Sequence, residues 1–276
     1  MGSDRRILAR KIGIIGCGAI GKRLALSIHE QFSKQAELTA LCDVDKRRAE
    51  TLAARLSPKP KITSTSDLIR SVDLVIEAAS MSISAEVVEA SIQAGKDVLV
   101  MSCGGLLGRP DLFDRAREKG TRIYVPSGAL AGLDGVRGAA MGRIDRAMLT
   151  SRKSPQSFEG APYVVKRQID LDGIKDETVL FEGSADEAIR EFPKNVNVAA
   201  TLALLGLGGQ KTRVRIVADP KISRNIHEIE LEGDFGKLIC RTENVVSPDN
   251  PRTSALAGLS ALAVIKGILD PVRIGT

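Results

Sequence analysis

The sequence predicts an α/β protein, with a doubly wound parallel sheet in the first half and a second α+β region behind it. Up to residue 126, short apolar runs alternate with longer helical patterns, which is the spacing of βαβ units. Beyond Pro126, extended runs appear in which apolar and polar residues alternate, as in antiparallel strands. The chain has 276 residues, of which 43% are hydrophobic, so it is long enough to bury a core in each region.

The first region is expected to hold five buried strands with helices between them. The strands are short runs rich in Ile, Val and Leu, at residues 11–16, 37–43, 74–78, 97–101 and 122–125. The helices have apolar residues three and four apart, at residues 19–32, 46–56, 67–71, 84–94 and 110–119. When a helix connects each strand to the next, the strands are parallel and the helices together cover both faces of the sheet.

The second region is expected to form a mainly antiparallel sheet with helices. Alternating segments predict strands at residues 166–171, 178–182, 213–218, 225–232 and 236–244. Helical patterns lie at 183–192 and 198–207. The last helix, expected at 253–269, is apolar nearly all round, so it should be buried against the first domain or at a subunit interface.

The composition excludes several classes of function. Aromatic residues make up 3% and Trp is absent, so a stacking platform for nucleic acid is not expected. The net charge of +6 is spread along the chain without a nucleic-acid module. The four cysteines have neither CxxC nor another metal-ligand spacing, which predicts reduced thiols and no metal site. With no apolar signal region and no membrane span in the sequence, we expect a cytoplasmic protein without a membrane partner.

The strongest motif is the segment GCGAIG at residues 16–21, which matches G-x-G-x-x-G and stands between a predicted strand and a predicted helix. The first glycine permits a tight turn, the second lets a pyrophosphate approach the backbone, and the third lets helix and strand pack closely. The helix N-terminus offers N–H groups to the phosphates. This context predicts a Rossmann dinucleotide site. Its candidate cofactor contacts are Gly16, Gly18, Ala19, Ile20 and Gly21.

Asp43 is the candidate ribose ligand, because it follows Gly21 by 22 residues and ends the second predicted strand. A carboxylate there accepts hydrogen bonds from the adenosine ribose and repels a 2′-phosphate, which favours NAD over NADP. The basic run 46–48 stands close enough to pair with a 2′-phosphate, so NADP use stays open.

His227 is the candidate acid–base residue, in an alternating strand that places Asn225 on the same face. Its side chain has an ordinary pKa suited to proton transfer near neutrality. The only other histidine, His29, lies near the end of the first helix and is expected at the surface. A structural role for His227 is the alternative reading of the same pattern.

Two further segments could meet a ligand. Asn195 and Asn197 stand at the entry to an apolar helix, where they could cap the helix or present amides to a carboxamide or carboxylate. The small-residue loop 126–134 follows the fifth predicted strand. Ligands of open parallel sheets bind beyond the carboxyl ends of the strands, so this loop should face the nicotinamide.

Taken together, these segments resemble the L-aspartate dehydrogenase family from the first strand to the last third of the chain. The matching pieces are GCGAIG at 16–21, PSGALAGLDG at 126–135, FPKNVNVAATL at 192–202, ADP at 218–220 and NIHEIELEGDFG at 225–236. The glycine motif is shared by many dehydrogenases. The second, third and fifth segments are the diagnostic ones.

The resemblance implies NAD(P)-dependent oxidative deamination of L-aspartate to oxaloacetate and ammonia, through iminoaspartate that feeds NAD biosynthesis. It makes His227 the active-site histidine, and Ala131 and Asn197 contacts of the nicotinamide dinucleotide. The two substrate carboxylates of this reaction require cationic or amide donors. The candidate substrate contacts are Asn195 and Asn225, with Asn197 as a further amide and an Arg or Lys that the sequence does not identify. The resemblance also implies a homodimer.

The expected domains are a dinucleotide-binding Rossmann domain at 1–126 and an α+β catalytic and dimerisation domain at 127–250, with the helical segment 251–276 packed on the first. Two other functions fit this plan. One is a different amino-acid-pathway NAD(P) oxidoreductase of the homoserine dehydrogenase kind. The other is a non-catalytic regulator that senses NAD.

Overall fold

The computed structural model describes residues 9–193, 197–247, 250–272 and 274. The chain forms two compact units. Unit 1 comprises the described residues up to Ser102, together with Arg109–Val125 and Ala261–Val272. Unit 2 comprises Cys103–Gly108 and the described residues from Pro126 to Ser260.

Unit 1 is built on a six-stranded sheet in the order β3-β2-β1-β4-β5-β6, in which every paired strand is parallel. This is the doubly wound order that the βαβ spacing predicts. The strands are β1 (Arg10–Ile15), β2 (Ala36–Cys42), β3 (Lys61–Ile62), β4 (Leu74–Glu77), β5 (Asp97–Val100) and β6 (Ile123–Tyr124). The short edge strand β3 lies in a turn-rich stretch where the sequence indicates no strand. The direction of winding reverses between β1 and β4, so the ligand crevice of such a sheet lies beyond their carboxyl ends.

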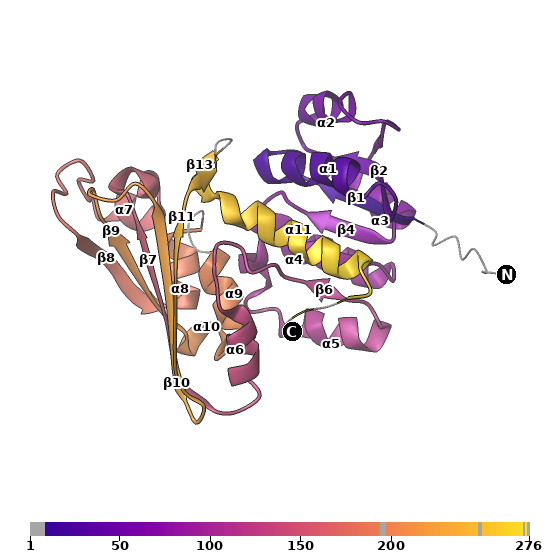
Figure 1. Ribbon diagram of the computed structural model, residues 1–276. Coiled ribbons are helices and arrows are strands. Elements are labelled where there is room, and N and C mark those ends of the chain that lie inside the picture. The colour runs from indigo at the N-terminus through magenta and orange to yellow at the C-terminus, as the bar shows by residue number, and fades with distance from the viewer. Residues whose placement is uncertain (1–8, 194–196, 248–249, 273, 275–276) are drawn as a thin grey trace. The chain divides into compact units, whose positions relative to one another are not determined.

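The helices of unit 1 surround this sheet (Figure 1). They are α1 (Ala19–Gln31), α2 (Lys46–Ala53), α3 (Thr65–Ser71), α4 (Met81–Gln93) and α5 (Pro110–Lys119). The helix α11 (Ala255–Leu269) adds its second half, where Ala261, Leu262 and Ile265 join the apolar core that also contains residues of β1, β2 and α1. The apolar side chains in the second half of α11 are therefore buried in the core of unit 1. Burial is incomplete, because Leu259 is exposed.

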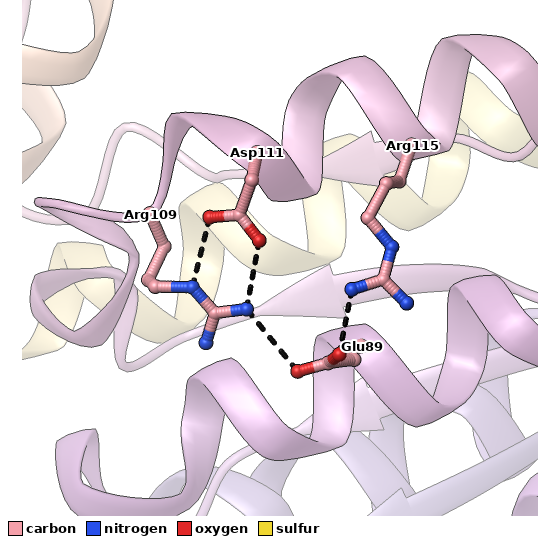
Figure 2. A network of polar contacts seen from close by, with 4 residues as sticks. All are labelled: Glu89, Arg109, Asp111 and Arg115. Carbon is pink, nitrogen blue, oxygen red and sulfur yellow. Dashed lines mark hydrogen bonds and ion pairs between the residues drawn. The ribbon is translucent and has the colours of Figure 1, made fainter.

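Helices α4 and α5 are joined by an ion network (Figure 2). Glu89 on α4 accepts from Arg109 at 3.1 Å with one oxygen and from Arg115 at 2.6 Å with the other. Arg109, at the N-terminus of α5, also donates two 2.8 Å bonds to Asp111. These hydrogen bonds lower the pKa of the Glu89 carboxyl below its ordinary value. Because the side chains are about one-third exposed, the network orients α5 more than it stabilises the unit.

Unit 2 is built on a five-stranded mixed sheet in the order β11-β10-β7-β9-β8 (Figure 1). Its strands are β7 (Ile144–Lys153), β8 (Thr178–Ser184), β9 (Arg213–Ala218), β10 (Asn225–Gly233) and β11 (Gly236–Asn244). Only the pairing of β7 with β9 is parallel, so the expectation of a mainly antiparallel sheet is confirmed. The small antiparallel pair of β12 (Val246–Ser247) and β13 (Asn250–Ser254) precedes α11.

Two expectations for unit 2 are wrong. The central strand β7 was not expected, because its apolar run is short and its first half carries Asp145 and Arg146. The strand expected at 166–171 does not form. The helix α7 (Pro162–Lys166) begins with a proline, which favours the first helical turn, and the chain turns at Gln168 with a φ of +51°.

The remaining helices of unit 2 are short. They are η1 (Cys103–Leu106), α6 (Leu133–Ala139), η2 (Pro155–Phe158), α8 (Ala185–Glu191), α9 (Asn197–Leu205) and α10 (Gly208–Lys211), in addition to α7. Phe158, Tyr163, Phe181 and Phe192 form one aromatic cluster with ring centroids 5.3–6.0 Å apart. These rings pack η2, α7 and α8 against β8, in a chain otherwise poor in aromatic residues.

Candidate active site

The three glycines of the loop between β1 and α1 have different steric environments. Gly16 has a φ of +96°, and a Cβ there would lie 2.5 Å from the Ala78 carbonyl oxygen. A Cβ on Gly21 would lie 1.8 Å from the Gly16 carbonyl oxygen. Both positions therefore exclude any side chain. At Gly18, which immediately precedes α1, no atom of the described residues lies within 4 Å of such a Cβ, so these residues leave open the space beside the helix N-terminus. Ala19 and Ile20, the first residues of α1, are half-buried.

Asp43 follows β2 and holds this loop in place. One carboxylate oxygen accepts a hydrogen bond from the Cys17 backbone N–H at 2.6 Å, and the other accepts from the Asp45 N–H at 2.8 Å. Each carboxylate oxygen has a further lone pair for a hydroxyl group. Asp43 and burial together raise the pKa of the Cys17 thiol to about 12, with burial the larger cause. The Cys17 side chain therefore remains a neutral thiol.

Glu77 ends β4 and was not expected as a site residue. Its side chain is buried and accepts hydrogen bonds from the backbone N–H groups of Ala79, at 2.9 Å, and Ser102, at 3.0 Å. Burial raises its pKa above the ordinary value, against the effect of these hydrogen bonds. Glu77 thus fixes the loops that follow β4 and β5 at the ligand edge of the sheet. The signal in the sequence was an acid inside an apolar strand.

His227 lies on β10 directly opposite Ser151 on β7, and the two side chains share one face of the unit 2 sheet. The Ser151 hydroxyl lies 3.1 Å from His227 Nδ1. The imidazole is 3% exposed, and this burial, together with the positive charge of Lys153, lowers its pKa to about 3. The ordinary histidine pKa, which made His227 a candidate acid–base residue in the sequence, therefore does not apply to the protein without ligand. Its ring is neutral at pH 7.

Lys153 ends β7 on the same face as Ser151, two residues away. It is 4% exposed, and burial lowers its pKa to about 8. Among the residues that the structure describes, it is the one buried lysine or arginine. Neither Lys153 nor Ser151 was expected as a site residue, because β7 was not expected as a strand. A lysine that continues a strand after an apolar run was the available signal.

The loop after β6 lies against the same end of this sheet. The Ala129 carbonyl oxygen accepts hydrogen bonds from Thr242 at 2.9 Å and from Asn244 at 3.0 Å. In the strand register, Thr242 lies opposite His227, so the loop is held beside the histidine strand. Ala131, further along this loop, is exposed and can meet a ligand.

The amide side chains expected at the site have separate positions. Asn197 begins α9 and is exposed, while its carbonyl oxygen accepts from the Cys103 thiol at 3.4 Å. Asn195 lies outside the described residues. Asn225 is buried on β10 and lies 3.5 Å from the Ser254 hydroxyl, to which its amide donates.

Asn225 also borders a cavity of about 310 Å³ at one end of the unit 2 sheet. The cavity is lined by Ser154, Gln156, Ser157, Glu159, Ile222, Ser223, Arg224, Asn225 and Val246. Ser154 follows Lys153 directly, so the cavity begins where β7 ends. Its lining is mostly polar and holds one cation and one carboxylate. This volume is within the range of small-molecule sites.

The described residues contain neither a candidate metal site nor a candidate membrane span. No group of three or more His, Cys, Asp or Glu side chains in this part of the chain could hold a metal ion. Within the same residues, no helix combines the length and the apolarity that a membrane span requires.

Comparison with known proteins identifies the family. The model for the C-terminal domain of aspartate dehydrogenase matches residues 134–268, and the model for the NAD-binding domain of homoserine dehydrogenase matches residues 16–126. The L-aspartate dehydrogenase of Methanosarcina mazei is 48% identical over 96% of this chain and 99% of its own length, and that of Methanosarcina acetivorans is 47% identical over the same shares. The chain belongs to the L-aspartate dehydrogenase family.

A solved structure of the family agrees with this assignment. The crystal structure of aspartate dehydrogenase from Thermotoga maritima has a TM-score of 0.71 at 26% identity and covers 96% of this chain and 99% of its own. As a member of the family, the chain is an oxidoreductase of the dehydrogenase type and uses a pyridine nucleotide. The match of the first domain to homoserine dehydrogenase reflects a shared NAD-binding domain. The second domain and the full-length relatives separate the two families.

Proposed function

We propose that this protein catalyses the oxidative deamination of L-aspartate, in which L-aspartate, NAD⁺ and water give oxaloacetate, ammonium, NADH and a proton. The observation that carries the proposal is the buried polar face of unit 2. It places His227, Ser151 and Lys153 together in a chain whose relatives carry the name L-aspartate dehydrogenase. The first product is iminoaspartate, which water hydrolyses. Supply of iminoaspartate to NAD biosynthesis is the proposed physiological role.

The residues at the end of β1 fit a dinucleotide. The open space beside Gly18 and the N–H groups at the start of α1 suit a pyrophosphate, and the lone pairs of Asp43 suit ribose hydroxyls. NAD is the preferred cofactor, because a 2′-phosphate would lie against the Asp43 carboxylate. When bound, the nicotinamide accepts the hydride from the substrate Cα. Ala131 and Asn197 are the proposed contacts of the dinucleotide in unit 2, where both side chains are exposed.

His227 is the proposed acid–base residue. The Ser151 hydroxyl engages Nδ1, which fixes the ring and leaves Nε2 for the substrate or for the water that attacks the imine. The neutral ring can take a proton from the substrate ammonium group, which must lose it before the C=N bond can form. Positioned acid–base groups of this kind typically contribute about 10²–10⁴-fold in rate.

The remaining assignments follow the same proposal. The proposed domains are a dinucleotide-binding domain at 1–126 and a catalytic and dimerisation domain at 127–250, with the helical segment 251–276 assigned to the first. The compact units differ from these bounds, because Cys103–Gly108 and the described residues from Pro126 to Ser260 belong to unit 2. Asn225 is a proposed substrate contact, with its buried amide on the His227 face. The protein is proposed to act as a homodimer in the cytoplasm.

The test is the absorbance at 340 nm of pure protein mixed with L-aspartate and NAD⁺, repeated with NADP⁺. His227→Asn should lose most turnover and keep NAD⁺ affinity, whereas His29→Asn, on the first helix of unit 1, should match the wild type. Oxidation of L-homoserine but not L-aspartate would assign the protein to the homoserine dehydrogenase type of reaction. NAD⁺ binding without turnover of either amino acid would favour an NAD-sensing regulator.

A further inference from the structure

The end of the unit 2 sheet gathers polar side chains that would ordinarily face water. Ser151 and Lys153 lie two residues apart on β7, and Asn225 and His227 lie two apart on β10, so each pair shares a face. The register sets His227 opposite Ser151, and its continuation sets Asn225 opposite Lys153. The four side chains therefore occupy neighbouring positions on one face. All four are buried.

Lys153 is the exceptional member of this group. A buried ammonium group is costly unless a carboxylate or several hydrogen bonds compensate it. Burial alone accounts for its lowered pKa, so among the described residues no carboxylate lies close enough to offset that cost. The amine still carries its proton at pH 7, because its pKa is about 8. An anion that enters this end of the sheet would therefore meet a positive charge that the described carboxylates leave uncompensated.

The neighbouring imidazole cannot supply this charge. The positive charge of Lys153 helps to lower the pKa of His227 to about 3, which shows that the two groups are within electrostatic reach and that only Lys153 is charged. The cavity of about 310 Å³ begins at Ser154 and Asn225, the neighbours of Lys153 along the strand and across the sheet. A four-carbon dicarboxylate is smaller than this cavity.

We propose that the Lys153 ammonium group binds one carboxylate of the dicarboxylate substrate beside His227, and thereby makes the site selective for dicarboxylates. The inference rests on the proposed function, because L-aspartate supplies the anion. Lys153 is then a specificity-determining residue and His227 the acid–base residue. Asn225 donates from the strand opposite Lys153.

The experiment is calorimetric titration of the NAD⁺-loaded protein with succinate. Succinate has the two carboxylates of aspartate and no amino group, so it reports carboxylate binding without turnover or proton removal. Lys153→Met should weaken succinate binding about 10–100-fold, the range for a hydrogen bond between charged groups. Lys153→Arg keeps the charge and should retain most of the affinity. Lys153→Gln serves as a second neutral variant if the Met variant does not fold.

Lys221→Met is the matched control. Lys221 is exposed in the same unit and pairs with Asp176, so its loss should leave succinate affinity unchanged. The inference is overturned if Lys153→Met binds succinate as the wild type does, even when turnover falls, because the amine would then act on the proton and not on the carboxylate. It is also overturned if Lys153→Met loses NAD⁺ affinity as strongly as succinate affinity, since the role would then be structural.

The two proposals fail separately. If the wild type binds succinate through Lys153 but does not oxidise L-aspartate, the carboxylate site stands and the proposed reaction is wrong. If the wild type oxidises L-aspartate but succinate binding is independent of Lys153, the reaction stands and this inference is wrong.

Discussion

Replacing Lys153 by methionine should stabilise the protein at neutral pH while it weakens substrate binding. Methionine is similar in length and carries no charge, so the substitution removes a buried ammonium group and keeps the packing of β7. Burial lowers the pKa of Lys153 from 10.5 to about 8. At about 1.36 kcal/mol for each tenfold change in the protonation constant, this corresponds to about 3 kcal/mol.

The sign and the pH range follow from the two states of the chain. Below about pH 8 the lysine is charged in both the folded and the unfolded protein, so the folded state bears the full cost of burying the charge. Between about pH 8 and 10.5 the folded state releases the proton while the unfolded state keeps it, and the cost declines as the pH rises. The advantage of Lys153→Met should therefore be about 3 kcal/mol at pH 7 and near zero above pH 10.5. His227, the titratable neighbour, stays neutral throughout this range.

Urea unfolding followed by circular dichroism at 222 nm measures this difference, and the chain has no Trp for a fluorescence assay. Wild type and Lys153→Met are compared at pH 7 and pH 10, with Lys221→Met as the exposed control. The urea midpoint of Lys153→Met should exceed that of the wild type at pH 7, and the gap should shrink at pH 10. A variant less stable than the wild type at pH 7, or a gap that does not change with pH, would refute the reasoning.

Three further predictions concern the cofactor and the histidine. Gly18→Val should fold normally and lose NAD⁺ binding, because its side chain would occupy the space left for the ligand. Gly21→Val should yield little folded protein, because its Cβ would clash with the Gly16 carbonyl oxygen. Thermal unfolding of both variants and calorimetric titration with NAD⁺ distinguish the two effects. In the same titration, Asp43→Ala should weaken the binding of NAD⁺ more than the binding of NADP⁺. Some affinity should be lost for both, because the Cys17 N–H loses its acceptor. Equal losses of affinity would contradict the assignment of Asp43 to the ribose. The pH profile of kcat/KM, which reports the free enzyme, should show no break from His227 between pH 5 and 8; a break there that disappears in His227→Asn would contradict a histidine pKa of about 3.

The first sheet could be predicted from the sequence because each of its long strands is a short run rich in apolar residues between helical patterns. The glycine loop could be predicted for the same reason, since its place between β1 and α1 is a local property of the chain. The different steric environments of its glycines could not be predicted in this way. The clash of a Cβ at Gly21 with the Gly16 carbonyl oxygen, for example, depends on how the helix packs on the strand.

The second sheet shows where sequence patterns fail. Strand β7 pairs with β10 and β9, from distant parts of the chain. Ser151 and Lys153 on β7 are buried, although no motif in the sequence singles them out. When β7 is not predicted, the sequence gives His227 neither a hydrogen-bond partner nor a buried environment, and only the ordinary histidine pKa can be assigned to it. Its neutral state and its serine partner are consequences of the tertiary structure, and so could not be inferred from spacing.

The burial of Lys153 and His227 on one face has a further consequence for the proposed reaction. In the free protein the charge of Lys153 disfavours the charged form of His227, and burial disfavours the charged form of both groups. A bound dicarboxylate reverses this balance, because a carboxylate beside two basic groups raises the pKa of each. The histidine is then a poor proton acceptor without substrate and a better one with it. In the proposed reaction, acid–base function at His227 would thereby be coupled to binding of a carboxylate at Lys153. A monocarboxylic amino acid that does not engage Lys153 would meet an imidazole of low pKa, which is a poor proton acceptor.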